Sequence, residues 1–377
     1  MPSRRYVLIL IGGGTVLAAG AAGGFVALNG PSRSARAPWR EAGQPTEFRR
    51  RALSYALLAP NPHNRQPWRV RLDGDDALTL YCDLDRRLPV TDPYDRQITI
   101  GCGAFLELLS IAAAEEGRVA EITPFPEGED LTTLDARPVA RVRFAPGAAP
   151  DPLFAQILQR RSNKEPYEPR DVSPALLRQL AQAGERPGVV SVTDGGPETV
   201  ARLRDLTWRA HLREVTTPAA MQESVDLMRI GAREVAANPD GIELEGPMFA
   251  LGRLAGVVTH ETLGDPEATA FKQGLDLYRS LALSARAFGW LLTEDGSRAA
   301  QLEAGRAYVR LNLKAAQLGL AIHPWSQALQ EYPEMRDLYA EAHAEIGDSR
   351  RIQMLFRIGY GRPVIPTPRR GLEAHLV

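Results

Sequence analysis

Two fifteen-residue segments of the chain, Gly103–Gly117 and Gly305–Gly319, align with each other from end to end. Both repeat apolar residues at helical spacing over a wide stripe, which is typical of a helix buried in a core. Their closing glycines stand where a left-handed C-cap residue is needed. A duplicated fold explains this alignment, although two unrelated Ala- and Leu-rich amphipathic helices would align as well. The apolar residues that align between the two segments are Leu109/Leu311, Ile111/Leu313, Ala113/Ala315 and Ala114/Ala316.

Strands and further helices are predicted around these two segments. Helical spacing recurs at Pro174–Ala183 and from Val200 to Val215. Helices outnumber strands and alternate with them, which predicts an α+β sandwich with a central sheet flanked by helices. Alternating or β-branched runs predict strands at Trp68–Leu72, Leu78–Asp83, Ala140–Phe144, Val189–Thr193 and Met354–Ile358.

The composition argues against several classes of function. The 45 basic and 46 acidic residues give a net charge of -1, so no basic field attracts nucleic acid. Cys82 and Cys102 form neither a C-x-x-C pair nor a cluster with histidine, so we expect no metal site. The two cysteines form one disulfide or remain buried thiols. His260-Glu261 lacks a second histidine at helical spacing, and Ser162 lacks a serine-elbow context, which disfavours a metalloenzyme or hydrolase.

The N-terminus has the pattern of a targeting segment. Arg4-Arg5 precede a Gly- and Ala-rich run from Val7 to Ser32 that contains no charged residue. The paired arginines resemble a twin-arginine signal, and an ordinary secretory signal is the alternative. The run is also long enough to cross a bilayer, which takes about 20 residues. We therefore expect residues 1–37 to export the protein to an extracytoplasmic, periplasmic compartment, and either to be removed or to anchor it in the membrane.

A cleavage pattern occurs at the end of this segment. Ala35-Arg36-Ala37 has the small-x-small form of a signal cleavage site, but Pro38 follows directly and disfavours cutting there. The sequence therefore leaves release and anchoring both open.

A proline-rich loop at residues 58–68 carries the first candidate binding residues. Its three prolines favour an extended loop over a helix, so the side chains of Asn64 and Gln66 are presented as fixed amides. Such amides suit a flavin ring edge, because each offers a donor and an acceptor. The alternative is a surface turn with unrelated polar residues.

Cationic residues mark two further segments. Arg160, Arg161, Ser162 and Lys164 lie close enough in sequence to hold a phosphate dianion by charge-assisted hydrogen bonds. A solvated helix end would show the same run of charges. Near the C-terminus, Gly359 and Gly361 permit close backbone approach, and the arginines that follow can reach a phosphate: Arg362, Arg369 and Arg370. The alternative for this end is a basic, proline-rich tail.

Together these segments resemble the nitroreductase superfamily, and most closely its long Acg-like branch of duplicated, fused-dimer proteins. Residues 59–68 are similar to the family loop A-P-S-x-x-N-x-Q-P-W, with Asn61 in place of serine. Residues 160–164 are similar to its arginine–serine element, with Lys164 in place of a second arginine. Residues 315–320, 358–363 and 369–370 match the family's helix end, its G-Y-G ending and its late arginine pair.

The resemblance, which covers about residues 46–370, implies an internally duplicated, nitroreductase-like FMN-binding sandwich. Residues 38–150 and 151–377 would form the two halves of one integrated fold, either as a monomeric pseudo-dimer or as part of a homodimer. Because the loop and the arginine element lie in different halves, we expect one complete site and one degenerate site.

The resemblance also implies roles for the candidate residues. Arg160, Arg161, Ser162 and Lys164 would hold the phosphate and ribityl end of FMN, with Arg369 and Arg370 as further phosphate ligands. Asn64 and Gln66 would hold the ring edge or ribityl chain, and Arg65 or Lys164 would place positive charge near the ring. No side chain is assigned as catalytic, because flavin N5 carries the chemistry.

The implied function is an FMN-dependent oxidoreductase that reduces a nitro, quinone or similar small acceptor. NAD(P)H would be a transient donor, since the chain has no dinucleotide-binding fingerprint. Export conflicts with this donor, because NAD(P)H is scarce outside the cytoplasm. A membrane quinone or redox partner then replaces it, or reduction precedes export, or the protein stores flavin without turnover. Residues 221–262 form a lid or pack against the other half.

Overall fold

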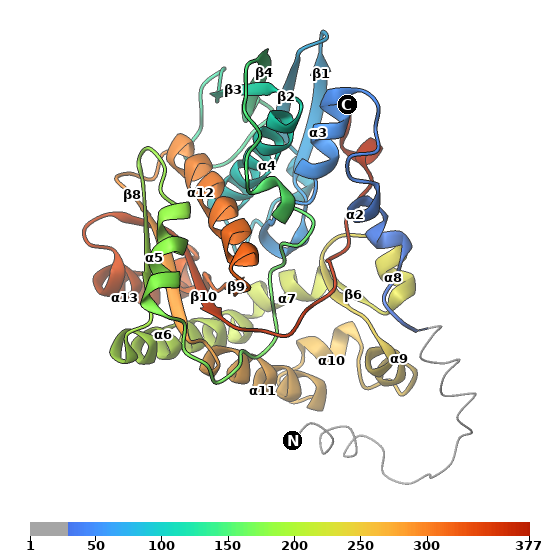
Figure 1. Cartoon of the computed structure of the whole chain (residues 1–377). Coiled ribbons are helices and arrows are strands. Elements are labelled where there is room, and N and C mark those ends of the chain that lie inside the picture. The colour runs from blue at the N-terminus through green and yellow to red at the C-terminus, as the bar shows by residue number, and fades with distance from the viewer. Residues whose placement is uncertain (1–28) are drawn as a thin grey trace.

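The computed structural model describes residues 29–377; the Arg4-Arg5 pair and most of the expected signal lie outside this range. The described chain contains two four-stranded antiparallel sheets with helices packed around them (Figure 1). The α+β class is confirmed, with one sheet in each half where the sequence indicated a single central sheet. The first sheet has the order β1-β2-β4-β3, formed by β1 (Trp68–Asp73), β2 (Ala77–Cys82), β3 (Arg118–Pro124) and β4 (Ala140–Pro146).

The second sheet repeats the topology of the first. Its order is β5-β8-β10-β9, formed by β5 (Val189–Asp194), β8 (Ala287–Thr293), β9 (Ala321–Pro324) and β10 (Arg351–Gly359). When the four strands of each sheet are numbered in chain order, both sheets have the spatial order first, second, fourth, third. The preceding helices also correspond: α3 (Phe48–Ala56) and α5 (Pro174–Ala183), then α4 (Arg96–Glu115) and α12 (Arg298–Gln317). This match confirms the internal duplication.

The two twenty-residue helices α4 and α12 pack against each other at the centre of the molecule (Figure 1). A Cβ on Gly103 would lie 2.1 Å from the Leu302 carbonyl oxygen, and one on Gly305 would lie 1.9 Å from that of Ile100. In the helix alignment Gly103 corresponds to Gly305 and Ile100 to Leu302, so the contact is reciprocal, as across a twofold axis. Two glycines therefore allow the helix backbones to touch.

An insertion distinguishes the second half. A short turn joins β1 to β2, whereas eight elements separate β5 from β8. Glu223, at the start of the expected lid segment, accepts hydrogen bonds from the backbone of Val90 and Thr91, so this segment packs against the first half. The inserted elements are α6 (Pro197–Thr216), α7 (Pro218–Asp226), β6 (Met228–Ile230), α8 (Ala232–Ala237), β7 (Ile242–Leu244), α9 (Pro247–Leu254), α10 (His260–Gly264) and α11 (Thr269–Leu283).

The C-terminal end of the described chain lies against the first half, whereas its N-terminal end contacts the insertion. The C-terminal tail leaves β10 and returns to β1, where Val377 donates its backbone N–H to the Val70 carbonyl. The remaining longer helices are α2 (Ala37–Glu41), near the tail, and α13 (Arg336–Ile346), on the second half (Figure 1). Short 3-10 helices span Ser34–Arg36, Pro62–Asn64, Leu84–Arg86, Phe154–Gln156, Gln327–Leu329, Pro333–Met335 and Leu372–His375.

The core accounts for several residues weighed in the sequence. Trp68 is fully buried on β1. Cys82 and Cys102 are separate buried thiols, and burial raises the pKa of Cys102 to about 12. Among residues 29–377, α4 is long and apolar enough to cross a membrane, but 83% of it is buried, as in a core helix. The same residues contain no cluster of three metal-binding side chains.

Candidate cofactor site

The loop before β1 is tightly folded, which corrects the expectation of an extended segment. His63, Asn64 and Gln66 have φ angles of 44°, 51° and 51°, in the left-handed region. The Asn61 carboxamide oxygen stabilises this turn by accepting the Gln66 backbone N–H at 2.7 Å. Gly101 of α4 leaves room for the turn, since a Cβ there would lie 3.2 Å from the Asn61 Cβ.

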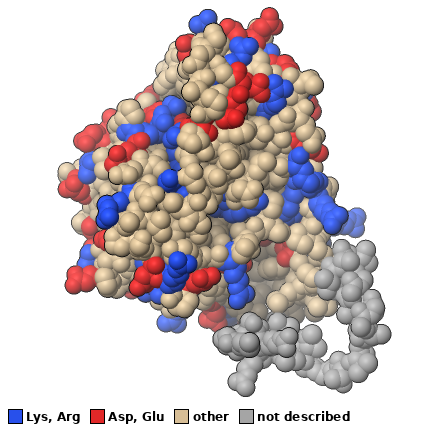
Figure 2. Space-filling model, viewed as in Figure 1, with Lys and Arg blue, Asp and Glu red and all other residues tan. Residues whose placement is uncertain are grey.

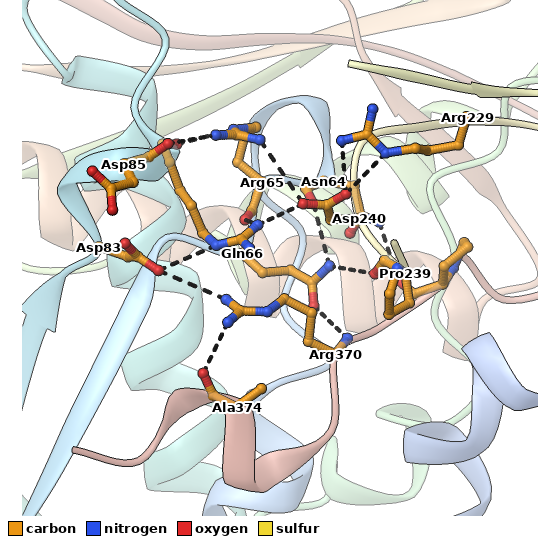
Figure 3. A network of polar contacts seen from close by, with 12 residues as sticks. Asn64, Arg65, Gln66, Asp83, Asp85, Arg229, Pro239, Asp240, Arg370 and Ala374 are labelled. Atoms are coloured by element: carbon orange, nitrogen blue, oxygen red, sulfur yellow. Dashed lines mark hydrogen bonds and ion pairs between the residues drawn. The ribbon is translucent and has the colours of Figure 1, made fainter. Parts of the chain in front are cut away.

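Gln66 is fully buried and uses its side chain within the protein. Its Nε2 donates to the carbonyls of Asn64 (3.2 Å) and Pro239 (2.9 Å), and its Oε1 accepts the Arg370 backbone N–H at 2.8 Å (Figure 3). All its polar atoms have partners, so it ties the loop to the insertion and to the tail. Binding of the flavin by Gln66 stays a prediction, and these contacts assign it a structural role as well.

Arg65 and Arg370 belong to the same polar network around the loop (Figure 3). Arg65 donates to the carbonyls of Asp85 (2.8 Å) and Arg86 (3.2 Å), and it lies 3.9 Å from the Asp240 carboxylate. Arg370 lies 3.7 Å from Asp83 and donates to the Ala374 carbonyl. Nearby carboxylates therefore balance both cations. Neither is the free charge that the sequence suggested for the ring or the phosphate.

Three other arginines gather around Trp39, and we call Arg160, Arg161 and Arg369 the arginine cluster. Their guanidinium carbons lie 5.9, 4.6 and 5.6 Å from the centre of the Trp39 ring. The described residues form no ion pair with any of the three, and the Arg160 and Arg369 side chains are buried. Positive charge is thus concentrated without a carboxylate in direct contact; Glu243 acts on Arg369 only from a longer distance.

The cluster joins segments that are distant in the chain. Arg160 donates to the Leu58 carbonyl at 2.8 Å, at the end of α3, and to Asn312 Oδ1 on α12 at 3.0 Å. Arg369 donates to the Leu57 carbonyl at 3.0 Å and to Asn64 Oδ1 at 2.6 Å. The loop, the arginine turn and the tail therefore meet at one place.

The three arginines differ in how fully they are hydrogen-bonded. All the nitrogens of Arg369 donate to protein oxygens, so it holds the loop and the tail together, and its assignment as a phosphate ligand stays a prediction. By contrast, the Nε atoms of Arg160 and Arg161 are buried and have no hydrogen-bond partner. A buried donor without an acceptor is costly, so these two atoms indicate a missing anionic partner.

Burial also weakens the basicity of these groups without discharging them. Burial lowers the pKa of Arg160 to about 10, and burial together with Arg160 lowers that of Arg369 to about 9. Both therefore stay protonated at neutral pH. A dianion at this place would relieve the repulsion between them and supply the absent acceptors.

Ser162 and Lys164 continue the arginine turn along β9. Ser162 forms a β-bridge with Ile322, and Lys164 is exposed. Burial, Lys164 and Arg65 lower the pKa of His63 to about 4, so this loop histidine is neutral at pH 7. His323 is also neutral, because burial, Arg357 and Lys164 lower its pKa. Lys164 is therefore close enough to both imidazoles to lower their pKa.

Comparison with known proteins identifies the family, although no family model matches the chain. The chain is 31% identical over 338 residues to the protein named "Putative NAD(P)H nitroreductase Rv3131" of Mycobacterium tuberculosis, covering 86% of this chain and 89% of that protein. It is 30% identical to "Putative NAD(P)H nitroreductase acg" of the same organism, with coverages of 87% and 95%. The chain belongs to the nitroreductase superfamily.

Solved nitroreductase structures show a more distant likeness. The FMN-dependent nitroreductase NfnB of Mycobacterium smegmatis, in complex with NADPH, is 19% identical. The alignment covers 58% of this chain and 94% of NfnB, with a TM-score of 0.37. A nitroreductase with bound FMN from Bacteroides fragilis is 12% identical, with a TM-score of 0.34.

Residues 32–39 contribute to the arginine cluster and its surroundings, although the sequence placed most of them in the signal. Trp39 Nε1 donates to the Thr367 carbonyl at 2.8 Å, and Arg36 Nε donates to that of Pro366 at 2.6 Å. The Ala35 carbonyl accepts the Arg369 backbone N–H at 2.8 Å. These residues therefore hold the tail in place.

A sequence signal for this segment exists within the chain. Residues 33–39 read R-S-A-R-A-P-W, and residues 161–167 read R-S-N-K-E-P-Y. The shared pattern of Arg, Ser, Pro and an aromatic residue marks 33–39 as the first-half copy of the arginine turn. Asn312 and His323 had no comparable signal, because only the fold brings them to the loop.

The equivalent place at the other end of the helix pair is filled by ion pairs, which we call the glutamate network. Buried Glu107 binds Arg306 at 2.8 Å, Arg310 at 2.9 Å and Arg186 at 3.5 Å. Glu303, which corresponds to Gly101 in the helix alignment, binds Arg186 at 2.8 Å. Here the loop before β5 meets paired charges, so no positive charge is left for an anion.

Two surface cavities lie elsewhere. One, of about 550 Å³, is lined by Tyr94, Tyr332 and Tyr339, and the other, of about 500 Å³, lies beside His260. Neither is lined by a residue of the arginine cluster, so the site rests on the charges and contacts above.

Proposed function

We propose that this protein is an FMN-dependent oxidoreductase of the nitroreductase type, which passes electrons from a donor such as NAD(P)H to a nitro, quinone or similar acceptor. The observation that carries the proposal is the arginine cluster, where two buried Nε atoms lack acceptors. The phosphate of a mononucleotide supplies the charge and the oxygens that this place lacks. Membership of the nitroreductase superfamily and the relatives named NAD(P)H nitroreductases support the electron-transfer reaction.

The chain's residues divide the work of binding. Arg160, Arg161 and Ser162 hold the phosphate and ribityl end, and Lys164 supplies positive charge toward the ring. When bound, FMN supplies hydride and electron transfer at N5. Arg369, Asn64 and Gln66 keep the loop folded, so that the binding groups are fixed before the cofactor arrives. Fixed groups lose little entropy on binding.

The duplication also bears on stoichiometry. Because the glutamate network fills the second equivalent place, we propose one FMN for each chain. Two FMN molecules for each chain would contradict this.

A flavin-storing protein without turnover is the second candidate. It is favoured by how thoroughly the loop is covered: Pro239 of the insertion, the tail and Trp39 all pack around it. Oxidation of NAD(P)H by the purified FMN form, with a nitro compound or a quinone present, separates the two. Steady turnover supports the reductase, and a single reduction without turnover supports storage.

We also propose export by the N-terminal twin-arginine-type segment. Any cleavage site then lies before Ser32, because Ala35 and Arg36 are buried in the folded body. The mass of the mature protein from an extracytoplasmic fraction tests this. An N-terminus at Pro38 would contradict the assignment, and recovery of the chain only in the cytoplasm would contradict export.

The decisive experiment for FMN is the visible absorption spectrum of the purified protein with a titration of FMN. Combined Arg160→Ala and Arg161→Ala should weaken FMN binding by more than about 100-fold, since hydrogen bonds to charged groups contribute about 1.5–3 kcal/mol each. Arg186→Ala, in the glutamate network, is the matched control and should leave FMN binding unchanged. Full FMN occupancy in the double variant would overturn the proposal.

A further inference from the structure

An apolar face is exposed on the insertion of the second half. Met248, Leu251 and Leu254 are 58%, 49% and 77% exposed. Their spacing of three residues places them on one side of α9, an eight-residue helix. Scattered apolar residues are common on protein surfaces, but a contiguous group marks a contact with a partner or a membrane.

The exposed apolar residues are concentrated in this region. Among residues 29–377, thirteen large apolar side chains are exposed, and five of them belong to α9 and α11, including Leu277 and Leu283. Both helices lie along the lower edge of the molecule (Figure 1). This concentration of exposed apolar side chains indicates a surface that contacts a partner or a membrane.

The chain's own N-terminal end lies beside this helix. Glu245 stands two residues before α9, and its carboxylate binds Arg36 at 2.7 Å and the Ser32 backbone N–H at 2.9 Å. Both side chains of this ion pair are almost fully buried, so the contact is part of the fold. Residue 32 is therefore fixed at the start of α9.

The residues before this point have the composition of a membrane segment. The run from Val7 to Ser32 holds no charged residue and is longer than the roughly 20 residues that cross a bilayer. Arg33 and Arg40 follow it and are exposed, and Arg40 donates to the Arg33 carbonyl at 3.1 Å. Figure 2 shows basic side chains gathered on the right-hand edge of the molecule. Such residues attract anionic lipid headgroups.

We propose that α9 rests in the surface of a lipid bilayer, with Met248, Leu251 and Leu254 toward the acyl chains, and that the chain enters the same bilayer just before Ser32. The helix then works as an interfacial contact beside the membrane-inserted run. The proposal does not depend on FMN, so it can fail or succeed independently of the function proposed above.

Spin labels on the full chain in vesicles of phosphatidylcholine and phosphatidylglycerol test this directly. Each variant carries one label. Leu251→Cys and Leu254→Cys place it on α9, and Leu131→Cys, at a residue 60% exposed between β3 and β4, is the control. The native cysteines are buried and should react little. Vesicles should raise collisions of the α9 labels with lipid-soluble oxygen several-fold and lower those with a water-soluble nickel chelate. The control label should not change.

Three results would overturn the proposal. Equal collision ratios at α9 and at residue 131 would mean that α9 faces water. Spin–spin broadening between labels would indicate a second copy of the chain as occupant. Protection from both reagents would indicate that another segment of the chain covers the helix. Met248→Cys repeats the measurement on the same face if one of the other two labels disturbs folding, which circular dichroism checks.

Discussion

The two ends of the α4–α12 helix pair have the same architecture and opposite electrostatics. At one end, a loop before the first strand of a sheet meets Gly101 and three arginines that form no ion pair with the described residues. At the other, the corresponding loop meets Glu303, and every nearby arginine has an acidic partner. A duplicated scaffold has thus kept its backbone symmetry while its side chains have specialised.

The difference shows how a duplicated fold can separate stability from binding. Paired charges in the glutamate network are satisfied within the protein and need no ligand. The arginine cluster leaves donors unpaired, which costs stability until an anion binds. One end therefore holds the halves together, and the other is suited to a ligand.

The largest expected effect lies at the symmetric contact itself. Gly103→Ala and Gly305→Ala should each lower the free energy of unfolding by about 3 kcal/mol or more, because each new Cβ overlaps a backbone oxygen of the facing helix. Urea unfolding measures this. Gly274→Ala in α11, where nothing lies within 4 Å, should be neutral or stabilising. A marked difference between the two core variants would show that the contact is not reciprocal.

Next comes the glutamate network. Glu107→Gln should lower the free energy of unfolding by about 2 kcal/mol, because three arginines lose a buried charged partner. FMN affinity should not change, because the arginine cluster is untouched. Exposed Glu121→Gln is the control and should shift stability by less than about 0.5 kcal/mol. Loss of FMN from the Glu107 variant would show that FMN binding depends on the glutamate network.

A smaller effect is expected from Trp39, which lies under the arginine cluster. Trp39→Leu should weaken FMN binding about tenfold, since cation–π contacts contribute about 1–2 kcal/mol when desolvated. Trp39→Phe keeps a ring and should lose less, although it also loses the hydrogen bond to Thr367. Equal affinities for wild type and both variants would show that the ring does not position the arginines.

The pH dependence of stability should be the smallest effect, and it should come from the insertion and from the C-terminal tail. Burial lowers the pKa of His211 to about 4 and that of His375 to about 3, below their usual 6.5. The unfolded chain therefore binds protons that the folded chain does not, and stability falls as pH falls below 6.5. Asp92, whose pKa burial raises to about 6, acts in the opposite direction.

The net loss from these groups should be about 1 kcal/mol between pH 7 and pH 6, measured by urea unfolding at each pH. His211→Phe, in the insertion, and His375→Phe, in the C-terminal tail, should each remove part of the slope. A stability that rises on acidification over this range would contradict the assignment.

Much of the architecture could be predicted from periodicity. Five strands and two helices agree with the predictions to within three residues at each end, and the helix repeat proved to be the symmetric core. The strands that were missed had weaker patterns. β8 is buried along its whole length and so shows no alternation, β9 has four residues, and β3 is largely exposed and carries charges.

The chain's own sequence determined the duplication, the family and the residue types that can bind an anion. Only the tertiary structure decided which cations are available. Arg65 and Arg370 face carboxylates, although one Arg370 nitrogen also lacks a hydrogen bond. Arg369 binds backbone carbonyls, and Arg160 and Arg161 have unpaired donors and no ion pair among the described residues. The reason is physical: the ion pairs and hydrogen bonds of an arginine depend on partners that are distant in sequence. The order of residues alone does not specify those partners.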